Sequence, residues 1–73
     1  MPTLRDLRPG EAGVVAKMNG QGPVKRRLME MGLTKGVRVE VKKVAPLGDP
    51  IEVSIRGYEL SLRKDEAALI DIG

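Results

Sequence analysis

The segment IEVSIRGYELSL at 51–62 constrains the fold more than any other stretch of the chain. If Arg56 and Gly57 form a two-residue turn, the strands on either side pair so that Ile55 faces Tyr58. Every opposing pair is then either apolar with apolar or polar with polar. A slip of one residue would turn the apolar side chains of both strands to solvent, so the pattern specifies its own register. The prediction is a β-hairpin with one buried face, on which Tyr58 points inward.

Three further segments have the pattern of strands. Val37, Val39 and Val41 alternate with charged residues, as expected for a strand with one buried face. The alternation fails at 42–44, so a β-bulge or the end of the strand is expected there. Together with the hairpin, the predicted strands lie at about 13–18, 37–44, 51–55, 58–62 and 69–72.

One helix is expected between the first two strands, beginning near Pro23. Proline is tolerated in a first helical turn because the N–H that it lacks would have no partner there. Gly32 lies where a left-handed residue commonly ends a helix, and Leu33 would then contact Leu28. The helix face expected to pack on the sheet carries Val24, Leu28 and Met31.

Two shorter features complete the chain. Thr3 and Asp6 have the spacing of a capping box, which predicts a single helical turn before Pro9. Residues 64–67 are expected to form a turn. A chain of 73 residues makes one domain, 1–73, and its five short strands with one helix after the first strand predict a small, mostly β barrel.

The composition argues against an enzyme. The chain has neither histidine nor cysteine, so the commonest general bases, nucleophiles and soft metal ligands are missing. Ser54 and Ser61 alternate toward the polar face of the hairpin with no evident base beside them. The methionines at 1, 18, 29 and 31 are scattered and are expected to fill gaps in the packing. We therefore predict no catalytic residue and no set of metal ligands.

The lengths of the apolar runs indicate where in the cell the protein is expected. The longest of them are far too short to span a bilayer, and the first residues lack the apolar run of a signal peptide. We expect a cytoplasmic protein that does not insert into a membrane.

The positive charge is concentrated in one segment. Residues 24–44 carry seven basic and two acidic side chains, whereas the chain as a whole has a net charge of +3. On the predicted helix, Met29 lies away from the buried stripe, between Lys25 and Arg26. Leu47 lies at the tip of a loop that contains two prolines, and a preordered loop loses less entropy on binding. These two apolar residues are candidate contacts for a partner protein with an acidic surface.

The same basic segment supports an alternative, a small nucleic-acid-binding barrel, because lysine and arginine contact phosphates. Single-strand binders of this kind also stack bases on aromatic side chains. Tyr58 is the one aromatic residue here, so nucleic acid is the second hypothesis rather than the expected partner.

Three stretches of the chain resemble the FeoA family, the small cytosolic component of bacterial and archaeal ferrous-iron uptake: RRLMEMGLTKG at 26–36, VAPLGDPIEV at 44–53 and LSLRKDEAALI at 60–70. The likeness covers nearly the whole chain in the same order. Its most specific part is APLGDP, followed by a strand and then LRK.

The resemblance implies an SH3-like β-barrel and a partner, the membrane transporter FeoB, whose cytosolic face includes a GTPase domain. The chain would then be a non-enzymatic accessory module, cytoplasmic and peripherally associated with that transporter. The residues that match the family's helix are Arg26, Arg27, Leu28 and Met29, and those that match its loop are Leu47, Gly48 and Asp49. With Lys25 from the helix pattern, they form the candidate docking set.

The family is also associated with transition metals. This gives a third hypothesis, a weak carrier of Fe(II), for which the chain offers no histidine or cysteine ligand. No cofactor is required on the docking hypothesis. An exposed strand edge would allow two copies of the chain to pair weakly.

Overall fold

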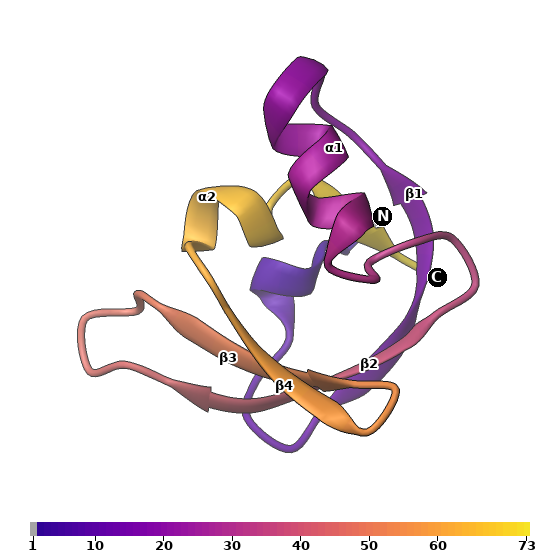
Figure 1. Cartoon of the computed structure of the whole chain (residues 1–73). Helices are drawn as coiled ribbons and strands as arrows, with labels where there is room; N and C mark the ends of the chain where they lie inside the picture. The colour runs from indigo at the N-terminus through magenta and orange to yellow at the C-terminus, as the bar shows by residue number, and fades with distance from the viewer. Residues whose placement is uncertain (1) are drawn as a thin grey trace.

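The computed structural model describes residues 2–73, so Met1 lies outside the described residues. Five antiparallel strands form one sheet in the order β4-β3-β2-β1-β5 (Figure 1). The strands are β1 Ala12–Met18, β2 Arg38–Val44, β3 Ile51–Ile55, β4 Tyr58–Leu62 and β5 Ile70–Ile72. Three short helices accompany them: η1 Leu4–Asp6, α1 Gly22–Glu30 and α2 Lys64–Ala67. The predicted mostly β fold with one helix after the first strand is confirmed.

The hairpin of β3 and β4 has the predicted register. Ile55 pairs with Tyr58, and the pairing continues without a slip to Ile51 and Leu62. The two turn residues, Arg56 and Gly57, have φ of 45° and 84°. A two-residue turn with positive φ at both central positions matches the right-handed twist of the strands, and glycine adopts that conformation without steric cost.

The irregularity predicted at 42–44 is a β-bulge. The register between β2 and β3 shifts between Val41 and Lys43, which leaves Lys42 as the extra residue. Because the bulge interrupts the alternation, Lys42 and Lys43 are both exposed. The buried side of β2 ends at Val41.

Helix α1 ends as the sequence predicted. Gly32 has φ of 101°. Its N–H donates to the carbonyl of Met29 at 3.0 Å, and the N–H of Leu33 donates to the carbonyl of Leu28 at 3.1 Å. These two hydrogen bonds are those of a Schellman motif, which satisfies carbonyls that the helix end would otherwise leave without partners.

The core is aliphatic and is closed by the helices. β2, β3 and β4 lie on one side of the molecule and α1 and α2 lie on the other (Figure 1). Each helix contributes a side chain that is fully buried: Leu4 from η1, Leu28 from α1 and Ala67 from α2. The capping interaction predicted for η1 is present, since the N–H of Thr3 donates to Oδ2 of Asp6 at 2.8 Å.

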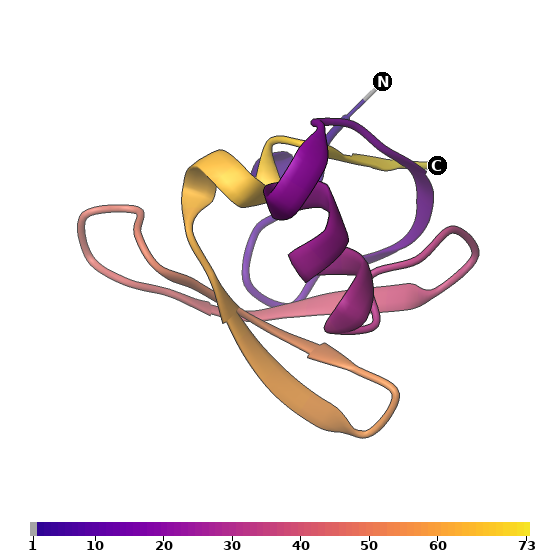
Figure 2. The same cartoon turned by 45° about the horizontal axis from the view of Figure 1, so that its top comes forward.

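Three local predictions were wrong. Val24 is 41% exposed, because the first turn of α1 points away from β2–β4 while the last turn lies over them (Figures 1 and 2). Tyr58 lies opposite Ile55, but at the end of the hairpin its ring stays exposed and its hydroxyl donates to the carbonyl of Met31. The expected turn at 64–67 is a helical turn, α2.

Gly13 offers a test of the contact between β1 and β5. A Cβ at Gly13 would collide with Cγ2 of the buried Ile72. Because the core is closely packed, we expect Gly13→Ala to lower the free energy of unfolding by about 1 to 3 kcal/mol, measured by urea denaturation.

The matched control is the same substitution in an Ile72→Ala background, where the colliding methyl group is absent. There Gly13→Ala is expected to have no destabilising effect. An equal loss in both backgrounds would show that the collision is not the cause.

Candidate functional site

The outer face of α1 forms a shallow groove around Met29. The groove has a volume of about 470 Å³ and is lined by Gly22, Lys25, Arg26, Met29, Glu30 and Thr34. Met29 is 44% exposed, so its predicted position on the solvent side is confirmed. Lys25 and Met29 are four residues apart and therefore lie on one face of the helix. Within residues 2–73, neither Lys25 nor Arg26 forms an ion pair, so both charges face solvent beside an apolar side chain.

Leu28 does not belong to this surface. Its side chain is fully buried in the aliphatic core, whereas Met29, about 100° farther around α1, is exposed. The inclusion of Leu28 among the docking residues is therefore corrected, because a buried side chain cannot contact a partner. Leu28 fixes the helix on the sheet.

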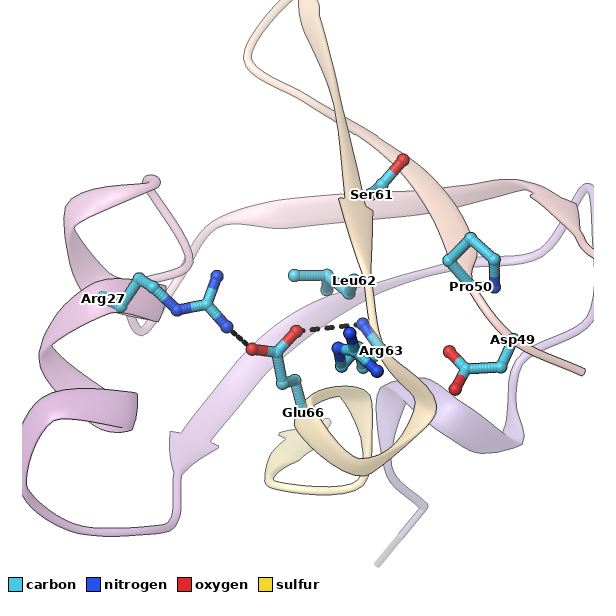
Figure 3. A pocket seen from close by; sticks show the side chains of 7 residues that line it. All are labelled: Arg27, Asp49, Pro50, Ser61, Leu62, Arg63 and Glu66. Atoms are coloured by element: carbon cyan, nitrogen blue, oxygen red, sulfur yellow. Dashed lines mark hydrogen bonds and ion pairs between the residues drawn. The ribbon is translucent and has the colours of Figure 1, made fainter.

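Arg27 points from α1 toward α2. Its guanidinium forms an ion pair with the carboxylate of Glu66 (Figure 3). The same carboxylate accepts a hydrogen bond from the N–H of Arg63 at 2.9 Å, which satisfies the amide of the residue that caps the start of α2. Glu66 is the one buried charged residue of the described chain, and both of its oxygens have partners. Arg27 thus connects α1 to α2 through this ion pair, and its side chain is half-exposed.

Asp49 has a similar part in the loop between β2 and β3. Its Oδ1 accepts a hydrogen bond from the N–H of Lys64 at 3.0 Å, so the loop is attached to the start of α2. Asp49 and Arg27 both line a hollow of about 390 Å³ at this junction, together with Pro50, Ser61, Leu62, Arg63 and Glu66 (Figure 3). The structure therefore brings these two predicted residues to one place.

Leu47 and Gly48 lie farther out on the same loop. Leu47 is 92% exposed. Gly48 has φ of 88°, and its N–H donates to the carbonyl of Ala45 at 2.7 Å. The N–H of Ala45 in turn donates to the carbonyl of Pro50 at 3.0 Å. These hydrogen bonds within the loop hold Leu47 at an exposed position without burying it.

The eight predicted residues do not form one surface. Met29 lines the groove on α1, whereas Leu47 lines a separate groove beside η1. The sequence prediction also missed Glu66, which links the helix to the junction. Its spacing from Arg63 is that of a capping box, but the Ser or Thr that usually marks the first position is absent.

The charge of segment 24–44 is partly neutralised within the protein. Glu40 lies 3.9 Å from Arg38 and 3.3 Å from Lys42, and Arg27 pairs with Glu66. Three of the seven basic side chains of the segment therefore have acidic partners. The groove on α1 keeps its cations free.

Two further searches cover residues 2–73. No three His, Cys, Asp or Glu side chains in that range lie close enough together to hold one metal ion. None of its helices combines the length and the apolar character needed to cross a membrane.

The tie between α1 and α2 gives a stability prediction. Glu66→Gln removes the charge that Arg27 contacts, so we expect the free energy of unfolding to fall by about 1 to 2 kcal/mol in urea denaturation. The difference should shrink in concentrated salt, because the guanidinium is half-exposed and screened.

Asp65→Asn is the matched control, since it removes the same charge from an exposed neighbour on α2. A surface change of this kind is expected to alter stability by at most about 0.5 kcal/mol. Equal losses for the two variants would mean that general charge, not the ion pair with Arg27, sets the stability.

Comparison with known proteins identifies the fold and the family. The FeoA domain family matches residues 3–72. The solution structure of a FeoA protein from Chlorobium tepidum is 39% identical, with a TM-score of 0.90 over 97% of this chain and 68% of that one. FeoA of Stenotrophomonas maltophilia, solved in complex with zinc and described as a procaryotic SH3 domain protein, is 27% identical, with a TM-score of 0.88 over 100% and 91% of the two chains. The predicted SH3-like fold is confirmed.

A curated relative places the same domain in a larger protein. A fusion of Fe(2+) transport protein A with the Fe(2+) transporter FeoB, from Porphyromonas gingivalis, is 36% identical over 69 residues. The match covers 94% of this chain and 8% of the fusion protein. The family match along nearly the whole chain, the SH3-like structure and this relative agree: the chain belongs to the FeoA family.

Proposed function

We propose that this chain is a non-enzymatic accessory module of ferrous-iron uptake that binds the cytosolic part of the transporter FeoB. The observation that carries the proposal is the similar fusion protein, in which an FeoA segment and FeoB form one polypeptide. Covalent linkage holds two domains at a high effective concentration, which is useful where they act together. Ferrous iron is the cargo of the transporter on this proposal, and the chain acts by contact.

The groove on α1 is the proposed main contact. Met29 supplies an exposed apolar side chain, and Lys25 and Arg26 supply positive charge around it. Binding energy in protein interfaces concentrates in a few central apolar side chains, while charges around them give orientation and rate of association. A partner surface with an apolar pocket and acidic neighbours would fit this groove. Leu47 and Gly48, with Asp49 behind them, are the second contact in the proposal.

The two alternatives have less support. For nucleic acid, three of the seven basic side chains of segment 24–44 form ion pairs within the chain. The hydroxyl of Tyr58, the one aromatic residue, donates a hydrogen bond to the carbonyl of Met31. For a weak Fe(II) carrier, residues 2–73 offer no convergent group of three ligands. The relative solved with zinc shows a metal in that protein, whose sequence is 27% identical.

Met29→Asp tests the docking proposal. It replaces the apolar centre of the groove by a carboxylate that would repel an acidic partner. We expect the affinity for the soluble cytosolic part of FeoB, measured by isothermal titration calorimetry, to fall about tenfold or more, which corresponds to ~1.4 kcal/mol.

Val14→Asp is the matched control, because Val14 is 43% exposed, close to the 44% of Met29, and lies on β1 instead of α1. It is expected to leave the affinity unchanged. Undetectable binding by the unaltered chain, or equal loss in both variants, would contradict docking through α1. A salt-dependent gel shift with mixed nucleic acid, abolished by neutralising Lys25 and Arg26, would favour the second hypothesis instead.

A further inference from the structure

A second groove lies beside η1, away from α1. Its volume is about 390 Å³, and it is formed by three segments: η1 with the turn after it, the loop between β2 and β3, and the start of α2. Its apolar wall includes Leu7, Val44 and the exposed Leu47. Its charged residues are Arg5, Arg8 and Lys64. The groove is therefore apolar along its wall and positive along its rim.

The charge of this groove is of one sign. Among the described residues that line it there is no aspartate or glutamate. Within residues 2–73, none of Arg5, Arg8 and Lys64 forms an ion pair. Three positive side chains thus surround an apolar wall with no internal partner for their charge.

Three of the acidic residues close to this groove in the sequence accept hydrogen bonds from backbone amides. The carboxylate of Asp6 accepts from the N–H of Thr3 at 2.8 Å, that of Glu11 from the N–H of Arg8 at 2.6 Å, and that of Asp49 from the N–H of Lys64 at 3.0 Å. These carboxylates organise the backbone around the groove. The cationic side chains of the rim remain available to a ligand.

We propose that this groove binds an acidic peptide segment that carries one large apolar side chain. The apolar residue would lie against Leu7, Val44 and Leu47, and carboxylates on either side of it would face Arg5, Arg8 and Lys64. A peptide fits better than a bilayer, because Leu7 and Val44 are half-buried and line a groove, where a narrow chain reaches them more easily than a flat surface does. Sign and shape therefore favour a flexible acidic segment of a protein.

This inference goes beyond docking through α1 and shares Leu47 and Gly48 with the second contact of the proposed function. Leu47, which is 92% exposed in the free chain, would be covered by the bound segment. The hydrogen bonds from Gly48 to Ala45 and from Ala45 to Pro50 hold the loop in place before binding, so little conformational entropy remains to be lost.

The probe is a fluorescein-labelled polyglutamate peptide with a central tryptophan, titrated with the whole chain and followed by fluorescence anisotropy. At about 50 mM NaCl, where surface charges are weakly screened, we expect a dissociation constant of about 100 μM. A peptide with serine in place of the tryptophan, and one with glutamine in place of the glutamates, should each bind at least about fivefold more weakly, because each lacks one of the two features.

Two double variants that each remove two positive charges test the role of the rim. Arg5→Gln with Arg8→Gln removes two cations from the rim, and Lys17→Gln with Lys35→Gln removes two exposed cations elsewhere. We expect the first pair of substitutions to weaken binding about fivefold and the second to have little effect, since each exposed charge pair contributes only modestly. Leu47→Ser should weaken binding through loss of the apolar wall.

Three results would overturn the proposal: no binding of the tryptophan peptide at about 1 mM chain, equal loss in both charge pairs, or binding to vesicles of phosphatidylcholine and phosphatidylserine in place of the peptide. Met29→Asp is expected to leave peptide binding unchanged, because Met29 lines the other groove. A failure here therefore leaves docking of FeoB through α1 standing, and a failure of that docking leaves the peptide groove standing.

Discussion

The structure depends on closing an aliphatic core with few large side chains. A chain of 73 residues buries a smaller share of its surface than a large domain does, and this one has a single aromatic residue to fill space. Closure is achieved by one fully buried side chain from each short helix: Leu4, Leu28 and Ala67. Because one fully buried residue attaches each helix to the sheet, most other positions on η1 and α1 face solvent, whereas Glu66 of α2 is buried with its charge paired. The exposed cations of α1 and η1 and the exposed Met29 are a consequence of this economy of packing.

Helix α2 organises the candidate surfaces although it is only four residues long. Glu66 receives Arg27 from α1 and the N–H of Arg63, and the N–H of Lys64 binds Asp49 of the β2–β3 loop. Two segments that are separate in the sequence are thereby held relative to each other through one turn of helix. Each of these interactions satisfies a backbone amide or a charge that would otherwise lack a partner. The position of the loop that carries Leu47 therefore follows from the capping of α2.

Sequence reasoning succeeded where a short pattern determines geometry by itself. The register of the 51–62 hairpin and the glycine end of α1 are of this kind, because alternation and a left-handed glycine act locally. It failed where exposure depends on what lies opposite. Val24 shares a helix face with Leu28 but lies in the first turn of α1, which points away from β2–β4 (Figure 1), and Tyr58 lies opposite the buried Ile55 but is itself 44% exposed. Sequence reasoning also missed Arg5, Arg8 and Lys64 in the groove beside η1, because they come from segments that only tertiary contacts bring together.

The two grooves differ in composition, since Glu30 lines the one on α1 and no acidic residue lines the other, but they share one feature. Each places one exposed apolar side chain among cations: Met29 beside Lys25 and Arg26, and Leu47 beside Arg8 and Lys64. Each groove is lined by fewer than ten residues, whereas a stable interface involves about 20 to 30 residues on each partner. Two small contacts on one rigid domain can still act together, because engaging the first raises the effective concentration for the second. If both proposed contacts engage one partner, their spacing has to stay fixed. Helix α2 favours this, because it joins α1 to the loop by an ion pair and a hydrogen bond.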